Sequence, residues 1–215
     1  MKSPINYMKY RVIVFDMDGV LVEEDSSWIT VHNYFKVNNG VSFKKYLNGE
    51  IDYCEFMKRD IALWPKVNIR EIEHIFNTTH PAEGAKYVID ELKKKGFITA
   101  LVSAGIDILA NRINDELGLD YVFANKLETD KMGNLTGTGQ CKVELLRKDL
   151  IVSELSKQLN IPLAKFVAIG DSKYDIPMLK IVGLSIAFHP KDNDIRDIAD
   201  VVIENSAITK LLDFL

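Results

Sequence analysis

The sequence lacks the features that mark several large classes of protein. No stretch of its 215 residues is apolar for long enough to span a membrane or to form the core of a signal peptide. No block of five or six like charges occurs, and the net charge at pH 7 is only -4. We therefore expect no membrane partner and no nucleic-acid partner.

Cysteine and histidine are too few and too scattered for a typical zinc site. Cys54 and Cys141 stand far apart without a CxxC motif, and the four histidines form no HxH or HExxH pattern. This usage indicates a reducing compartment rather than a secreted, disulfide-rich scaffold. We expect a cytoplasmic protein, a monomer or a homodimer, long enough for one domain with an insertion.

Short β-branched runs alternate with helical stretches along most of the chain. The runs lack amphipathic alternation, as strands buried on both faces do, and they cover residues 11–15, 98–102, 165–169, 184–188 and 200–203. The helical stretches end at glycine, asparagine or proline, and they cover residues 83–95, 106–117 and 142–159. This alternation predicts an α/β fold, a Rossmann-like parallel sheet with helices on both faces.

One long interval after the first run carries helix signals but no buried strand. Asp25 or Ser26 can cap its first helix, and Asp52 can cap the second. We predict that this interval is a small helical cap domain inserted into the α/β core. The predicted cap covers 23–81, and the core covers 1–22 and 82–215. A hairpin is also expected within residues 126–138.

Polar residues follow three of the predicted strands at the point where each ends. Asp16 and Asp18 follow the first, Ser103 follows the second, and Asp171 with Asp175 follows the third. Because ligands bind beyond the carboxyl ends of parallel strands, we expect these side chains to surround one crevice. Four carboxylates so close repel one another unless a cation lies among them, and Mg²⁺ prefers oxygen ligands. The sequence therefore predicts a magnesium site.

Two of these carboxylates are spaced to act on one reacting centre. Side chains two apart on an extended segment point the same way, so Asp16 and Asp18 can face the same substrate atom. Aspartate is a nucleophile in phosphoryl transfer. A second carboxyl whose pKa is raised by its neighbours can donate and then accept a proton. The pair is thus suited to a two-step displacement at phosphorus.

The order of these motifs resembles that of the haloacid dehalogenase-like (HAD) superfamily. Residues 16–22 are similar to its first motif, 102–105 to its second and 170–175 to its fourth, and Lys148 falls where its third-motif lysine is expected. Within that superfamily the overall pattern is most similar to the phosphoserine phosphatases. The resemblance implies a HAD-like core with a cap and a Mg²⁺-dependent phosphatase of a small phosphorylated metabolite.

The resemblance also implies roles for individual residues. Asp16 is expected to be the phosphorylated nucleophile and Asp18 the acid/base. The expected metal ligands, directly or through water, are Asp16, Asp18, Asp171 and Asp175. The expected phosphate-binding groups are Ser103, Ala104 and Lys148. Lys142 lies in the same stretch as Lys148 and competes with it for the third motif.

Some positions depart from the phosphoserine phosphatase pattern. Ser172 and Tyr174 replace a glycine and an asparagine of the fourth motif. The cap arginine that holds the substrate carboxylate in that family falls near Asp60, and an aspartate there repels a carboxylate. The candidate substrate contacts in the cap are Asp25 (or Glu23, Glu24), Lys58 and Arg59.

Other functions remain compatible with the motifs. Phosphotransfer to an acceptor other than water uses the same first step. A receiver-like phosphate relay combines similar residues, but such modules are about half this length and carry the phosphorylated aspartate after a later strand. A catalytically silent phosphate-binding protein can keep the fold, since fold alone does not prove activity.

Overall fold

A seven-stranded sheet forms the centre of the structure, a computed structural model that describes residues 9–24 and 26–215. The strand order is β4-β3-β2-β1-β5-β6-β7, and every neighbouring pair is parallel except β3 with β4. The strands are β1 (Val12–Phe15), β2 (Ile98–Ile106), β3 (Tyr121–Thr129), β4 (Leu135–Gln140), β5 (Phe166–Gly170), β6 (Leu184–Phe188) and β7 (Val201–Ile203). The predicted parallel sheet is confirmed.

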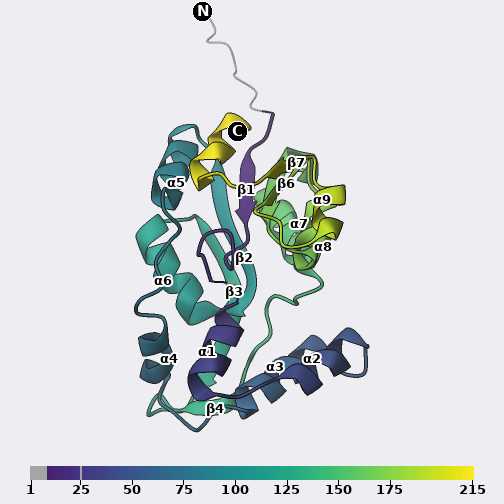
Figure 1. Ribbon diagram of the computed structural model, residues 1–215. Helices are drawn as coiled ribbons and strands as arrows, with labels where there is room; N and C mark the ends of the chain where they lie inside the picture. The colour runs from purple at the N-terminus through teal and green to yellow at the C-terminus, as the bar shows by residue number, and fades with distance from the viewer. Residues whose placement is uncertain (1–8, 25) are drawn as a thin grey trace, which may run out of the picture.

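Helices cover both faces of this sheet. Figure 1 shows α5 and α6 on one side and α7, α8 and α9 on the other. The helices are α1 (Ser27–Phe35), α2 (Gly40–Leu47), α3 (Tyr53–Ala62), α4 (Ile69–Ile75), α5 (Ala85–Lys94), α6 (Asp107–Leu117), α7 (Lys148–Leu159), α8 (Ile176–Leu179) and α9 (Asn193–Ile198). Short 3₁₀ turns complete the set: Leu163–Lys165, Lys173–Asp175 and Ile208–Asp213.

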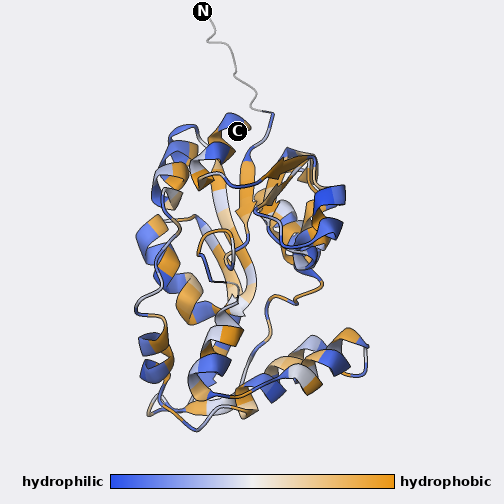
Figure 2. Cartoon of the chain, in the orientation of Figure 1, coloured by the Kyte–Doolittle hydropathy of each residue, from blue (hydrophilic) through white to orange (hydrophobic). Residues whose placement is uncertain are grey.

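Strand β1 shows why the sequence runs were uniformly apolar. Ile13 and Phe15 pack into the core on the α5 and α6 face, whereas Val12 and Val14 pack into the core on the α7 face. Successive side chains of a strand point to opposite faces, so a strand covered on both sides needs apolar residues at every position. Figure 2 shows this apolar sheet with polar residues on the outer sides of the helices.

The helices α1 to α4, which we call the cap helices, lie in the chain between β1 and α5 (Figure 1). Helix α3 packs against β4 of the hairpin, α2 packs against α3, and α1 packs against α4 and β2. Ser26 caps α1 by accepting from the Ile29 N–H, and Asp52 caps α3 by accepting from the Glu55 N–H at 2.7 Å. Helix α2 was not foreseen. The boundaries 23–81 for an inserted domain stay a prediction.

Three local expectations differ from the structure. Strand β2 continues to Ile106, with a shift of register against β3 after Val102. Helix α7 begins at Lys148 rather than at Lys142, and in the segment before it the backbone N–H groups of Lys142 and Val143 donate to the Asn125 side chain at 2.8 Å each. The predicted hairpin is present, with a longer first strand.

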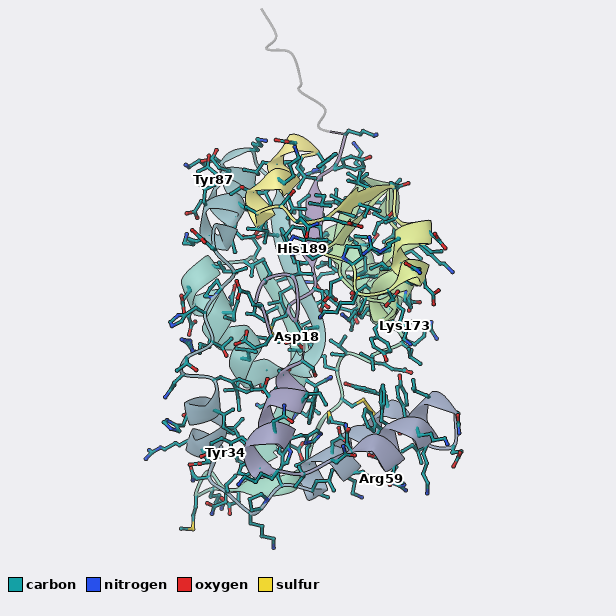
Figure 3. All side chains as sticks on the ribbon, in the orientation of Figure 1. Asp18, Tyr34, Arg59, Tyr87, Lys173 and His189 are labelled. Carbon is teal, nitrogen blue, oxygen red and sulfur yellow. A yellow bond between two sulfur atoms is a disulfide. The ribbon has the colours of Figure 1, made fainter. Side chains whose placement is uncertain are left out.

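Cys54 on α3 and Cys141 after β4 form a disulfide, a pairing that the sequence analysis did not foresee. Their Cα atoms lie 5.4 Å apart although the residues are 87 positions apart in the chain. The cap helices are thereby joined covalently to the end of the hairpin (Figure 3). Among the residues described, no helix combines the length and the apolar character that a membrane span requires.

Candidate active site

The loop after β1 carries the first functional side chain at the carboxyl edge of the sheet. The Asp16 N–H donates to the Ile169 carbonyl of β5 at 2.9 Å, which holds the two strand ends together. The Asp16 carboxylate is buried, and its Oδ1 accepts from the Met17 N–H at 2.8 Å. Asp16 is therefore fixed by backbone groups on a rigid edge.

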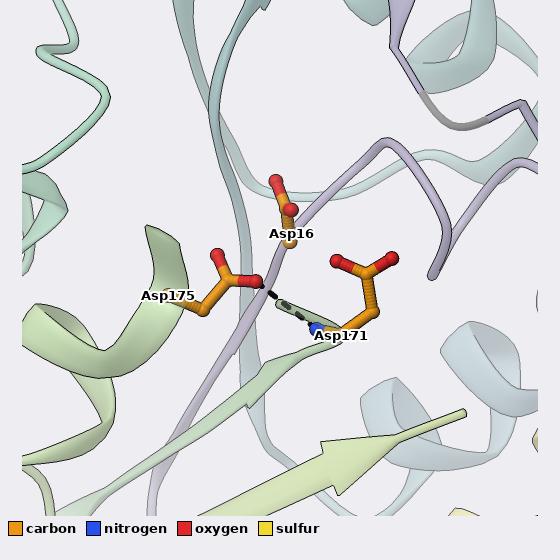
Figure 4. Close-up of side chains that lie close together, drawn as sticks. All are labelled: Asp16, Asp171 and Asp175. Atoms are coloured by element: carbon orange, nitrogen blue, oxygen red, sulfur yellow. Dashed lines mark hydrogen bonds between the residues drawn. The ribbon is translucent and has the colours of Figure 1, made fainter. Parts of the chain in front are cut away.

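The residues after β5 bring two more carboxylates to the same place. Carboxylate oxygens of Asp16, Asp171 and Asp175 lie within 4.8 Å of one another, and all three side chains are buried (Figure 4). Asp175 Oδ2 accepts from the N–H groups of Asp171 at 3.0 Å and Ser172 at 3.2 Å, which closes the turn after β5. Buried carboxylates so close together form an all-oxygen site that suits a hard cation such as Mg²⁺.

Lys148, the first residue of α7, bridges two of these carboxylates. Its Nζ lies 2.7 Å from Asp16 Oδ1 and 2.6 Å from Asp175 Oδ1, and its side chain is buried. Burial lowers the pKa of Lys148, but the attraction of Asp16 and Asp175 outweighs it and raises that pKa above its usual value. Lys142 instead lies over the Phe123 ring at 5.0 Å, outside the cluster. Between the two lysines, the structure places Lys148 at the site.

Asp16, Asp18 and Asp171 have raised pKa values, chiefly because their carboxyl groups are buried. Burial, with Asp175 as the next cause, raises the pKa of Asp16 well above its usual value and that of Asp171 to about 6. Burial also raises the pKa of Asp18 to about 6. Among the residues that the structure describes, Asp18 Oδ1 has no hydrogen-bond partner, while Oδ2 accepts from Ser27 Oγ at 3.3 Å. Asp18 is thus suited to proton transfer and the cluster to binding a cation.

The end of β2 supplies the expected phosphate-binding groups. Ser103 is buried, lines the same cavity as Asp16, and accepts from the Gly105 N–H at 2.9 Å. The Ala104 carbonyl accepts three hydrogen bonds, from Trp28 Nε1 at 2.9 Å, Tyr53 Oη at 3.0 Å and Asn125 Nδ2 at 2.8 Å. These three hydrogen bonds fix the backbone of β2 in the stretch where its register with β3 shifts, between Val102 and Ile106.

Sequence reasoning missed the role of Asn125. It is fully buried, and its Nδ2 also donates to the Tyr53 hydroxyl at 3.1 Å and to the Val143 carbonyl at 2.9 Å. The Asn125 side chain, from β3, therefore links the end of β2, helix α3 and the segment that leads to Lys148. The sequence around Asn125 did not indicate this role, because its hydrogen-bond partners come from distant parts of the chain.

Gly19 and Lys191 complete the surroundings of Asp171 and were also missed. Lys191 Nζ lies 2.6 Å from Asp171 Oδ2. A Cβ at Gly19 would lie 1.9 Å from the same oxygen, and the φ of this residue is +79°, a conformation that favours glycine. The DMDG sequence thus contains a glycine that lets the loop pass close to Asp171.

A cavity of about 390 Å³ lies between this edge of the sheet and the cap helices. Its floor includes Asp16, Asp18, Ser103, Lys148 and Asp171. Its roof includes Trp28, Phe43, Tyr53, Phe56 and Asp60. The two departures noted in the fourth motif, Ser172 and Tyr174, also line it. The volume suits a small ligand.

Two of the substrate contacts expected in the cap, Lys58 and Arg59, lie outside the cavity. Lys58 is exposed and Arg59 pairs with Glu55 at 2.7 Å, and neither lines the cavity (Figure 3). Asp60, the next residue of α3, lines it instead. Consecutive helical residues point about 100° apart, so the three cannot all face the cavity. Asp25 lies outside the described residues.

Comparisons with known proteins agree with this geometry. The family model for haloacid dehalogenase-like hydrolases matches residues 13–180. A phosphoserine phosphatase of Methanocaldococcus jannaschii is 33% identical, over 96% of this chain and 98% of the relative. A phosphoserine phosphatase of Polaromonas sp. is 33% identical, over 95% of this chain and 89% of the relative.

Solved structures show the same likeness. One described as a phospho-aspartyl intermediate analogue of phosphoserine phosphatase has a TM-score of 0.81 and 32% identity, covering 97% of this chain and 100% of the other. A substrate-bound phosphoserine phosphatase complex also has a TM-score of 0.81, with 31% identity, covering 97% of this chain and 99% of the other. The chain belongs to the haloacid dehalogenase-like hydrolases, in their phosphoserine phosphatase-like family.

Proposed function

We propose that this protein is a Mg²⁺-dependent phosphatase of small phosphomonoesters and that Asp16 is its nucleophile. The observation that carries the proposal is the buried group of Asp16, Asp171 and Asp175, with oxygens within 4.8 Å, bridged by Lys148. The relatives named phosphoserine phosphatase support the same activity. A cytoplasmic location and a monomeric or homodimeric state stay predictions.

In the first step an oxygen of Asp16 attacks phosphorus and the ester oxygen leaves. Asp18, whose pKa is raised to about 6, donates a proton to that oxygen, so the alcohol departs neutral and an acyl phosphate remains on Asp16. Lys148 offsets negative charge on Asp16 and on the phosphoryl group, and Ser103 with the Ala104 N–H is placed to bind phosphoryl oxygens. Mg²⁺, when bound by Asp16, Asp171 and Asp175, supplies charge neutralisation.

In the second step water replaces the carboxylate. Asp18, now ionised, accepts a proton from water as that water attacks phosphorus, and inorganic phosphate leaves with Asp16 restored. The cap helices enclose the cavity and limit competing water during the first step.

Release of phosphate from p-nitrophenyl phosphate with Mg²⁺ tests the activity directly. We expect turnover by the wild type and a labelled acyl phosphate after rapid acid quench with a ³²P-labelled substrate. Label that appears on no residue, together with full turnover, contradicts the nucleophile assignment. Transfer of phosphate to an added alcohol in preference to water would replace hydrolysis with phosphotransfer.

A further inference from the structure

A buried carboxylate in the roof of the cavity has only neutral partners among the described residues. Asp60 Oδ2 accepts from His32 Nε2 at 3.1 Å and Asn39 Nδ2 at 2.7 Å, and Oδ1 accepts from Ser42 Oγ at 3.2 Å. Asp60 is 1% exposed and lines the cavity. Hydrogen-bond donors therefore face both oxygens of Asp60, and this carboxylate lies close to the ligand space.

The state of His32 decides whether this charge is neutralised. Trp64 Nε1 lies 2.8 Å from His32 Nδ1. An indole N–H can only donate, so His32 Nδ1 accepts and carries no proton. The proton of the neutral imidazole is therefore on Nε2, where it is donated to Asp60. His32 is held uncharged, and Asp60 keeps its negative charge.

Aromatic side chains form much of the rest of the roof. Trp28, Phe43, Tyr53 and Phe56 line the cavity, and the Phe56 ring lies 5.7 Å from that of Phe43 and 6.0 Å from that of Tyr53. The faces of such rings attract cations and repel anions. The Asp60 carboxylate, which lines the same cavity, acts in the same direction, because Coulomb attraction is strong where water is excluded.

Positive side chains line only the floor of the cavity in the described part of the chain. Lys148 and Lys191 are the basic lining residues, and both are paired with the carboxylates of the floor. The cap helices therefore offer an anionic and aromatic surface to the alcohol portion of a phosphomonoester, opposite the groups placed to bind phosphate.

We propose that Asp60 is a specificity-determining residue that selects phosphomonoesters whose alcohol carries an ammonium group and no carboxylate. This inference rests on the proposed phosphatase function and narrows its substrate class. The Asp60 charge and the aromatic roof bind the ammonium group, whereas a carboxylate at the same place meets an uncompensated like charge. The substrate class is therefore an amino-alcohol phosphate.

Four substrates of similar size separate the two charges. Ethyl phosphate carries neither group, O-phosphoethanolamine an ammonium, phosphoglycolate a carboxylate, and O-phosphoserine both. We expect the kcat/KM of O-phosphoethanolamine to exceed that of ethyl phosphate by about tenfold or more and that of phosphoglycolate to fall below it. A value for phosphoglycolate or O-phosphoserine equal to or above that of O-phosphoethanolamine overturns the inference.

A variant tests whether Asp60 is the cause. Asp60→Asn removes the charge at nearly constant size and is expected to lower the ratio of O-phosphoethanolamine to ethyl phosphate kcat/KM at least fivefold. Glu55→Gln, which removes a charge from the same helix outside the cavity, is the matched control and should leave the ratio unchanged. An unchanged ratio in folded Asp60→Asn overturns the role of Asp60.

The same measurements distinguish a failure of the proposed substrate class from a failure of the proposed phosphatase function. Because the four-substrate comparison uses the wild type, it decides the substrate class even where the variant does not fold. Hydrolysis of p-nitrophenyl phosphate without an ammonium preference overturns the substrate class and leaves the phosphatase function standing. Hydrolysis of none of these esters with Mg²⁺ overturns both.

Discussion

Lys148 Nζ lies 2.7 Å from Oδ1 of Asp16, with both side chains buried at the edge of the sheet. The lysine is the first residue of α7 and the aspartate directly follows β1, so the pair forms only when the fold brings these two elements together. A buried carboxylate is tolerated only with such a partner, and the same contact places a positive charge beside the attacking oxygen.

Replacing Lys148 by alanine should lower activity by at least about a thousandfold and destabilise the fold by roughly 3–5 kcal/mol, because buried carboxylates lose their partner. Lys142→Ala is the matched control, since Lys142 is exposed and lies over Phe123. Kinetics with p-nitrophenyl phosphate and urea unfolding measure both effects. A larger loss in Lys142→Ala would move the third motif to that residue.

Asp16→Asn should abolish turnover, because an amide does not replace the carboxylate as nucleophile. It should also raise Tm in the absence of metal, since one of several mutually repelling buried charges is removed. Differential scanning fluorimetry beside the phosphatase assay checks both expectations. Hydrolysis near the wild-type rate refutes the assignment of Asp16.

The raised pKa of Asp18 should make the free energy of unfolding decrease as the pH rises. Its pKa is raised by burial from 3.8 in the unfolded chain to about 6 in the fold, so folding takes up a proton between these values and stability falls as the pH increases through that range. Asp18→Asn removes this dependence. Without metal, we expect the variant to be more stable than the wild type above pH 6 by about 1 kcal/mol, or ~2–4 °C in Tm. The difference should vanish near pH 4, and an equal difference at both pH values contradicts the shift.

Mg²⁺ should stabilise the fold through the carboxylate cluster. We expect Tm to rise with Mg²⁺ concentration in the wild type and not in Asp171→Asn. Asp213→Asn, on the exposed C-terminal 3₁₀ turn, serves as the control and should keep the shift. Ca²⁺ is expected to bind and to inhibit, because its larger, looser coordination shell accepts both oxygens of Asp16. Full activity with Ca²⁺ in place of Mg²⁺ argues against direct coordination.

The Cys54–Cys141 disulfide should stabilise the protein by about 2–4 kcal/mol, since it closes a long loop. Reduction by dithiothreitol is expected to lower Tm in the wild type. Cys54→Ala should start from the lower Tm and show no response to the reductant. A wild-type Tm that does not change on reduction contradicts this contribution.

The buried strands and the motif order were predictable because their signals are local. Uniformly apolar runs identify strands covered on both faces, and three of these runs are followed within three positions by a polar residue of the site: Asp16, Asp18, Ser103 or Asp171. The start of α7 was not predictable, because the segment before it is held by a residue far away in the sequence: Asn125 of β3 accepts from the backbone N–H groups of Lys142 and Val143.

The residues that form the roof of the cavity could not be predicted from the local sequence. Lys58 and Arg59 have the charge that suits a phosphorylated ligand, yet Asp60 is the residue of that triplet that faces the cavity. Helix α3 is oriented by its packing against the β3–β4 hairpin and by the link from Cys54 to Cys141. Both contacts join segments far apart in sequence.

The sequence by itself determined the parallel sheet, the family and the carboxylates at the strand ends, because burial on both faces and short motifs leave local patterns. Tertiary structure alone decided that Lys148 rather than Lys142 meets Asp16, that Cys54 meets Cys141, and that an uncharged His32 leaves Asp60 anionic over the ligand. The physical reason is that charge pairing, hydrogen-bond direction and burial depend on distances between segments, and the fold sets those distances.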